Sequence, residues 1–306
     1  MDEKITSWIK KEGYPLEFSV AHKFKQQRYS VDQSYFVKDG EGKIREIDVL
    51  ATQSINVGGS LLRIVHVVEC KWSKDKPWIL FADEKRYAST ALAAQLISTS
   101  IGQALCWAAA GNDEFKLLNM FSNSGFSFYG RQAFSKGNDL FYSSVQSVVS
   151  NCVSIVSNYN EYEFRIDRPS IAVIAIPVII VDGFLYEASF NEEEHDLDVV
   201  QVKSSRLRWR GNDKRSLNTV VDIVTEESLD QYLEQRGQEM KVLFKSWSDT
   251  FEQLIKCFNE KTEAHLKIKE GPRGIHGRPL ILSQLREISA SNNTLHTDAS
   301  GDAPVS

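Results

Sequence analysis

The chain has 306 residues, of which 42% are hydrophobic and 25% are charged, and its net charge at pH 7 is −5. This is the composition of an ordinary soluble globular protein, with enough length for one large domain or two smaller ones. The negative charge argues against a general nucleic-acid coat protein, although a local basic groove could still bind nucleic acid, because binding follows the local field.

The cysteines and the apolar segments indicate a protein of the reducing cytoplasm. Four widely spaced cysteines without a CxxC pair predict free thiols rather than disulfides or a zinc site; they are Cys70, Cys106, Cys152 and Cys257. The N-terminus carries acids and has no uninterrupted apolar core, so we expect no signal peptide. The longest apolar run, residues 171–181, is too short to span a bilayer. We therefore expect a cytoplasmic protein with no membrane segment.

The first part of the chain predicts two helices and then three strands. Apolar residues at helical spacing indicate helices over residues 2–13 and 15–29, and Glu17 stands in the first turn of the second helix. The helix dipole favours an acid there, so capping alone would explain Glu17. Strand-forming residues separated by turn signals predict strands over 30–39, 44–57 and 61–73.

The middle of the chain predicts helices and a loop. Alanine-rich residues 83–110 indicate a helix, and residues 140–159 indicate another. The glycine-, serine- and asparagine-rich residues 111–139 between them are typical of a loop with short elements.

The last part predicts strands, one long helix and a tail. The continuous apolar run at 171–183 is typical of a buried strand, and 185–190 and 197–209 are further strand candidates. A long amphipathic helix is predicted over 224–258, with Thr225 as its N-cap.

The second and third predicted strands form a hairpin that brings two acids together. The pair Gly58 and Gly59 is a tight hairpin signal. If this turn sets the register, Leu50 lies opposite Val67, Asp48 opposite Glu69, and Glu46 opposite Lys71, although a bulge would shift the pairing by one residue.

Two opposed carboxylates are destabilising unless something holds them together. A divalent cation with oxygen ligands, Mg²⁺ or Mn²⁺, would do so, and Lys71 would point into the same space as Glu69 because the two are two residues apart on one strand. The alternative is a solvated strand edge on which Lys71 pairs with Glu46. By the same alternation, Cys70 and Trp72 would face the other way and pack under the following helix.

These residues resemble the PD-(D/E)xK, or restriction-endonuclease-like, nuclease superfamily. The resemblance rests on Glu17 on a helix, then IREIDVLA with Asp48, then VVECK with Glu69 and Lys71, in this order and on suitable elements. One departure is Ile47, which stands where the family's name has a proline; many members lack that proline.

The resemblance implies an α/β fold with an α-β-β-β-α-β core, in which a mixed central sheet is flanked by helices. Residues 1–110 would then hold the first part of the core with the metal site, and 111–168 an insertion of a loop plus a helix. Residues 169–286 would hold the remaining core strand, a β-ribbon and a C-terminal helix, and 287–306 would form a disordered tail.

The resemblance also implies a metal-dependent nuclease, with a role in restriction, repair or defence against foreign DNA. Asp48 and Glu69 would bind Mg²⁺ or Mn²⁺, with the backbone carbonyl of Cys70 as a further ligand. Lys71 would be the catalytic lysine, and Glu17 would assist the metal site. DNA is the expected partner, RNA stays open, and a homodimer is an option that many relatives use. The alternative is a non-catalytic module on a nuclease-like fold that binds nucleic acid or proteins.

A basic segment is the best candidate for nucleic-acid contacts outside the hairpin. Arg206, Arg208 and Arg210 alternate along one strand face, with Lys214 nearby and Trp209 as a stacking surface. The alternative is a charged outer face.

Two other features have plainer explanations. Asp198, Gln201 and Lys203 imitate the nuclease motif, but no hairpin acid precedes them, so an edge strand of a solvated ribbon explains them better. His66 faces away from Glu69 on the third strand, which indicates a packing role.

Overall fold

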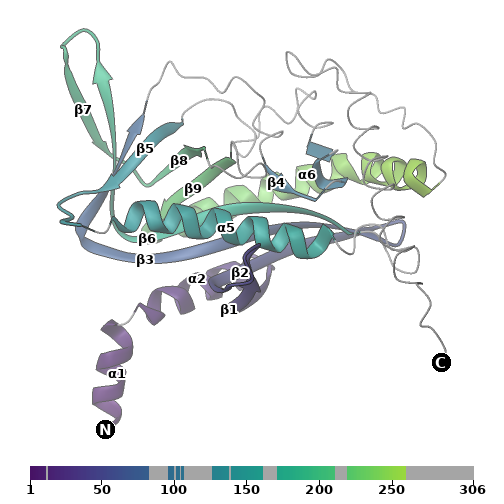
Figure 1. Ribbon diagram of the computed structural model, residues 1–306, viewed down its shortest axis with the longest axis horizontal. Helices are drawn as coiled ribbons and strands as arrows, with labels where there is room; N and C mark the ends of the chain where they lie inside the picture. The colour runs from purple at the N-terminus through teal and green to yellow at the C-terminus, as the bar shows by residue number, and fades with distance from the viewer. Residues whose placement is uncertain are drawn as a thin grey trace, which may run out of the picture.

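The computed structural model describes residues 1–11, 13–82, 96–99, 101–103, 105–106, 126–137, 139–160, 171–210 and 219–259. These residues form a mixed α/β structure in which one large mixed sheet is flanked by helices (Figure 1). Among the described helices, none combines the length and the hydropathy that a transmembrane span requires.

Two helices and three strands open the chain, as predicted; they are α1 (Asp2–Lys11), α2 (Tyr14–Gln26), β1 (Ser30–Lys38), β2 (Ile44–Val57) and β3 (Ser60–Ala82). Strand β3 is longer than predicted. Its pairing with the strand that begins at Ile171 is irregular between Ser73 and Trp78, and β3 then continues to Ala82. Trp72, predicted to pack under a helix, is 54% exposed instead.

The remaining elements confirm the predicted helix over 140–159 and most of the long predicted helix over 224–258. The strands predicted over 171–183 and 185–190 are one strand, and the strand predicted over 197–209 is two. In chain order, these remaining elements are β4 (Ile97–Ser98), β5 (Ser127–Gln132), α5 (Leu140–Asn160), β6 (Ile171–Asn191), β7 (Asp196–Gln201), β8 (Ser204–Trp209), β9 (Thr219–Thr225), the 3-10 helix η3 (Glu226–Ser228) and α6 (Leu229–Asn259). Strand β9 was not predicted. Within the segment predicted as a helix over 83–110, β4 is a strand, whereas the described residues 101–103 and 105–106 are helical. The predicted tail from residue 287 and residues 83–95 lie outside the described residues.

Strands β3 and β6 form the centre of the sheet. They run parallel and pair from Leu61 with Ile171 to Phe81 with Ala188. Antiparallel β2 and β1 extend the sheet beyond β3, while β9, β7 and β4 pair with β6. The first half of β6 is buried almost throughout, which explains its continuous apolar run.

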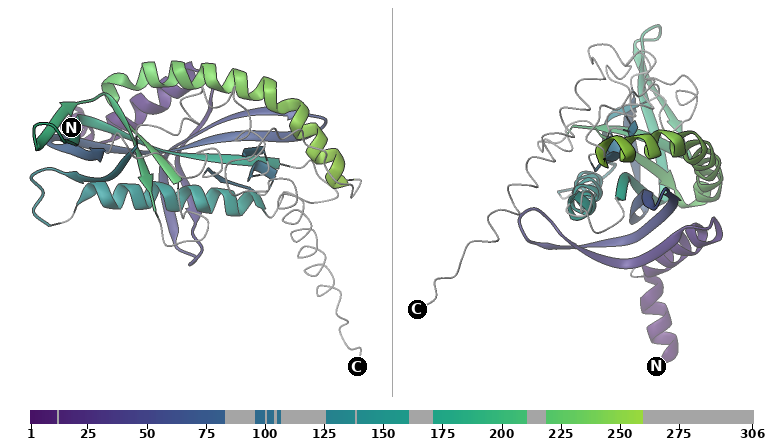
Figure 2. Two further views of the ribbon diagram at one scale, coloured as in Figure 1. Left: turned by 90° about the horizontal axis from the view of Figure 1, so that it is seen from above. Right: turned by 90° about the vertical axis from the view of Figure 1, so that its right-hand side faces the viewer.

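Helices cover the two faces of the sheet separately. Figure 2 (left) shows α5 on one side and α6 on the other, with the strands between them. Strand alternation builds the two cores: Val68 and Cys70 of β3 pack with α2 and α6, whereas Val65 and Val67 pack with α5. We call these the α6 face and the α5 face.

The predicted hairpin register is confirmed from the turn to Val49 and Val68, but the predicted pairs Asp48–Glu69 and Glu46–Lys71 lie beyond the end of the ladder and do not form. Leu50 pairs with Val67, and the ladder runs without a shift from Val57 and Ser60 at the Gly-Gly turn to Val49 and Val68. Both turn glycines have positive φ angles, 58° at Gly58 and 83° at Gly59, which glycine adopts at little cost.

A second hairpin, made of the end of β6 and β7, projects from the body as an arm (Figure 1). Every residue of β7 is exposed. The structure thus confirms the prediction that Asp198, the acid of the motif look-alike, lies on a solvated ribbon. Asp198 accepts a hydrogen bond of 3.0 Å from Asn191 there.

Candidate functional site

The predicted acid of β2 lies where β2 and β3 separate. Their ladder ends at Val49 and Val68, one residue short of Asp48. Beyond this point a side chain replaces the backbone as the hydrogen-bond acceptor: Oδ2 of Asp48 accepts a hydrogen bond of 2.7 Å from the Cys70 N–H. Asp48 is therefore fixed by its own strand and by the strand that carries the other motif residues.

Glu69 is held from two sides. Its Oε1 lies 2.6 Å from the Lys71 ammonium, and its Oε2 accepts a hydrogen bond of 3.2 Å from the Ser147 hydroxyl of α5. The side chain is buried, with 8% of the residue exposed. Lys71 thus pairs with Glu69 on its own strand, and not with Glu46 as the alternative prediction had it.

Glu17 approaches the same group from α2, half-buried in the first helical turn. Burial, then the charge of Glu46, raises the pKa of Glu17, and the charges of Lys71 and Glu69 also act on it. A capping role alone does not explain this placement, because the acid lies within the electrostatic reach of the hairpin motif. The structure therefore brings all four motif residues into one neighbourhood.

The two hairpin acids cannot both be charged without cost. Burial, and after it the charge of Glu69, raises the pKa of Asp48 to about 7, although the Cys70 N–H and Lys71 act in the opposite direction. Burial alone would lower the pKa of Lys71, but the charge and hydrogen bond of Glu69 outweigh it, so that this pKa is raised. At neutral pH Lys71 is therefore a charged ammonium, whereas Asp48 is close to the midpoint of its titration, with protonated and charged forms in similar amounts.

This donor set fits a hard divalent cation. Mg²⁺ typically takes one or two protein carboxylates and completes its shell with water and substrate phosphate, and two carboxylates that repel each other gain from a cation between them. The described residues contain no group of three or more His, Cys, Asp or Glu side chains arranged to hold a metal ion. The thiol of Cys70 is buried, and burial raises its pKa well above the usual range, so only the carbonyl of Cys70 suits such a site.

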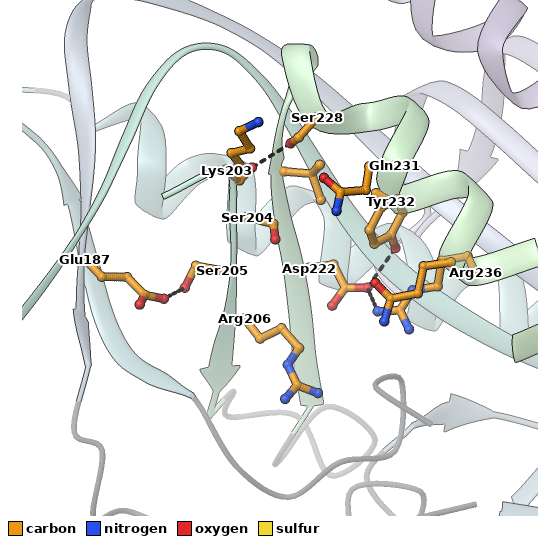
Figure 3. A pocket seen from close by; sticks show the side chains of 12 residues that line it. Glu187, Lys203, Ser204, Ser205, Arg206, Asp222, Ser228, Gln231, Tyr232 and Arg236 are labelled. Carbon is orange, nitrogen blue, oxygen red and sulfur yellow. Dashed lines mark hydrogen bonds and ion pairs between the residues drawn. The ribbon is translucent and has the colours of Figure 1, made fainter. Parts of the chain in front are cut away.

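The predicted basic segment lies elsewhere. Arg206 lines a pocket beneath α6 (Figure 3). Its guanidinium lies 4.6 Å from the centre of the Phe126 ring. Arg208 is half-buried, Arg210 is exposed, and Lys214 lies outside the described residues. Because Glu69 contacts α5 and Arg206 faces α6, the sheet separates the two groups, and they cannot contact one phosphate. Trp209 packs edge-on against Tyr142, with 5.5 Å between the ring centres.

The pocket beneath α6 has a polar lining and a volume of about 450 Å³. Its floor is a buried network in which Asp222 of β9 accepts hydrogen bonds from Tyr232 (2.7 Å) and Arg236 (2.8 Å) of α6 (Figure 3). Arg236 also pairs with Glu239. Sequence reasoning missed this network. The available signal was Arg236 itself, which interrupts the apolar stripe formed by Leu233 and Met240 on a helix.

His66 has the packing role that was predicted. It is fully buried on the α6 face, with its ring centre 5.8 Å from Phe24 and 5.3 Å from Tyr29. Burial lowers its pKa to about 3, so the ring is neutral at physiological pH.

No model of a known protein family, no curated protein and no solved structure matches this chain.

Proposed function

We propose that this protein is a metal-dependent nuclease that hydrolyses phosphodiester bonds, with DNA as its substrate. The observation that carries the proposal is that, at the fork between β2 and β3, Asp48 binds the Cys70 N–H while Glu69, the residue before Cys70, pairs with the ammonium of Lys71. Burial and the charge of Glu69 raise the pKa of Asp48, and an acid whose pKa is raised by burial together with a specific charged neighbour is typical of metal-binding and catalytic groups. Because the fold favours the uncharged form of Asp48, an uncharged residue at this position would make the hairpin more stable. Stability alone therefore does not explain the carboxylate.

Each residue has a distinct task in this proposal. Asp48 and Glu69 would hold Mg²⁺ or Mn²⁺, which when bound polarises a phosphate and lowers the pKa of an attacking water. Lys71 would neutralise charge that develops on the phosphate, because its raised pKa keeps it protonated. Glu17 would add negative charge beside the cation.

The proposal is tested by cleavage assays on plasmid DNA, linear DNA and RNA, with Mg²⁺ or Mn²⁺ and with a chelator. We expect cation-dependent cleavage that falls at least about 100-fold in Lys71→Ala, the usual scale for removing one transition-state contact. Lys245→Ala, which removes an exposed lysine of α6, should cleave like the wild type.

Metal binding separates the two tasks. Calorimetry should show that Asp48→Ala loses Mg²⁺ binding, whereas Lys71→Ala keeps it. Cleavage that is equal in the wild type and in both variants would refute the proposed site. Cleavage of RNA alone would make the protein an RNA nuclease, and no cleavage of any substrate would favour a non-catalytic binding module.

A further inference from the structure

The projecting arm, formed by residues 186–191 of β6 and by β7, has an open strand edge (Figure 1). Among the described residues, β7 pairs with β6 and with no other strand, and all of its residues are exposed. In an edge strand, every second residue turns its backbone N–H and C=O away from the neighbouring strand. Asp196 already accepts a hydrogen bond of 2.7 Å from the Leu197 N–H, so an added strand would pair along the rest of β7.

One face of the arm is apolar. Opposed residues of an antiparallel pair lie on the same face, so Phe190 shares its face with its partner Leu197 and with Val199, two residues along β7. These three side chains are 61%, 58% and 56% exposed, in that order. Single exposed apolar residues are normal, but three neighbours beside an open strand edge are typical of a surface that another chain covers.

The opposite face of the arm is acidic. Strand alternation places Asp196 and Asp198 there, followed by Val200. Asn191 donates a hydrogen bond to Asp198 (3.0 Å), but an amide does not offset the charge of a carboxylate. Residues 186–201 contain six acidic residues and no lysine or arginine. The arm therefore carries a strong negative charge beside its apolar face.

This charge decides between two occupants of the edge. If a second copy paired antiparallel through its own β7, with the apolar side chains on one face, Asp196 and Asp198 would lie beside the same residues of the other copy. Like charges on neighbouring strands are destabilising. A strand with lysine or arginine on that face would be attracted instead, so charge complementarity favours a basic partner over a second arm.

We propose that the edge of β7 binds an extended segment of a partner protein in which apolar residues alternate with lysine or arginine. Added as a further strand, this segment lays its apolar side chains beside Leu197 and Val199 and its basic side chains beside Asp196 and Asp198. Backbone hydrogen bonds supply affinity in this mode of recognition, and the alternating side chains supply specificity. The proposal does not depend on the reaction at the candidate site, because the arm acts by recruiting a partner.

The test is fluorescence anisotropy with a labelled peptide of alternating valine and lysine, matched in length to the six residues of β7. Three peptides serve for comparison. The first has the same composition with the valines grouped, the second is N-methylated throughout and donates no backbone hydrogen bond, and the third has glutamate in place of lysine. The alternating lysine peptide should bind more tightly than all three.

Asp198→Lys tests the acidic face of the arm. We expect it to bind the lysine peptide roughly 2- to 30-fold more weakly than the wild type, the scale of exchanging one attractive cross-strand pair for a repulsive one. The same variant should bind the glutamate peptide more tightly. Asp249→Lys, which reverses an exposed charge on α6, is the matched control and should bind both peptides like the wild type.

Three results would overturn the proposal. They are binding of none of the peptides, equal binding of the alternating and the N-methylated peptide, and unchanged binding in Asp198→Lys. Analytical ultracentrifugation adds a fourth: a wild-type dimer that dissociates in Val199→Asp would show that the edge binds a second copy. Each of these results would leave the outcome of the cleavage assays unchanged.

Discussion

Asp48→Asn should stabilise the metal-free protein while abolishing metal binding. Asparagine has nearly the same shape, and its Oδ1 can accept the hydrogen bond that the Cys70 N–H donates to Asp48. The amide carries no charge, so it does not repel Glu69. The exchange therefore isolates the cost of keeping a second carboxylate charged in this site.

The size of the effect follows from the pKa of Asp48, which is about 7 in the folded protein against 3.8 for a free side chain. Because the folded-state pKa is raised, the fold favours the protonated acid. Its contribution to stability is complete below pH 3.8 and is lost as the pH rises through about 7. At about 1.4 kcal/mol per pH unit, the full loss is about 4 kcal/mol. We expect Asp48→Asn to gain about 1–4 kcal/mol at pH 8 and under 1 kcal/mol at pH 4.

Urea unfolding between pH 4 and pH 8, in the presence of a chelator, measures this difference. Asp32→Asn, which changes an exposed acid on β1, is the control and should not change stability with pH in this way. Added Mg²⁺ should raise the stability of the wild type and not of Asp48→Asn. If Asp48→Asn is less stable than the wild type at pH 8, or if its advantage does not depend on pH, the carboxylate is not destabilising and the reasoning fails.

Three further changes test other parts of the structure. Ser147→Ala should raise the Mg²⁺ dissociation constant roughly 10-fold in calorimetry, because it removes a hydroxyl that orients a ligand, and Ser147→Thr should restore it. Arg236→Met should lower the free energy of urea unfolding by about 3–5 kcal/mol, since Asp222 stays buried without its cation; the double variant with Asp222→Leu should recover part of this loss. Gly183→Ala should cost about 1–3 kcal/mol and lower Tm, because the added Cβ would lie 2.5 Å from the Ser73 carbonyl oxygen. A dissociation constant unchanged in Ser147→Ala, or a free energy of unfolding unchanged in Arg236→Met or Gly183→Ala, would contradict the role given to that residue's contact.

Local patterns were enough to predict the hairpin and its motif. The Gly58 and Gly59 turn fixes the register, because a two-residue loop leaves one way to pair the strands. The alternation of apolar and charged residues then places Glu69 and Lys71 together. What the pattern could not give was the fork at Asp48, because the point where two strands separate depends on the rest of the sheet.

Long-range packing accounts for what the sequence did not reveal. Strand β9 was missed because VVDIVT runs directly into a strong helix pattern without a turn signal. The alternation of Arg206 and Arg208 was visible, but the face of the sheet they occupy depends on α6 and on pairing with β9. Trp72 has the alternation of a core residue, yet no helix covers it among the described residues.

The parallel pairing of β3 with β6 has a consequence for how the chain is made. Roughly 90 residues separate the end of β3 from the start of β6, and ribosomes add about 5–20 residues per second. For roughly 5–20 s, the nascent hairpin of β2 and β3 therefore has an open, apolar strand edge, which is the kind of edge that joins other chains. We therefore expect the yield of folded protein to depend on chaperones that bind the exposed edge during that interval. Slower translation, or a longer connection between β3 and β6, should increase aggregation.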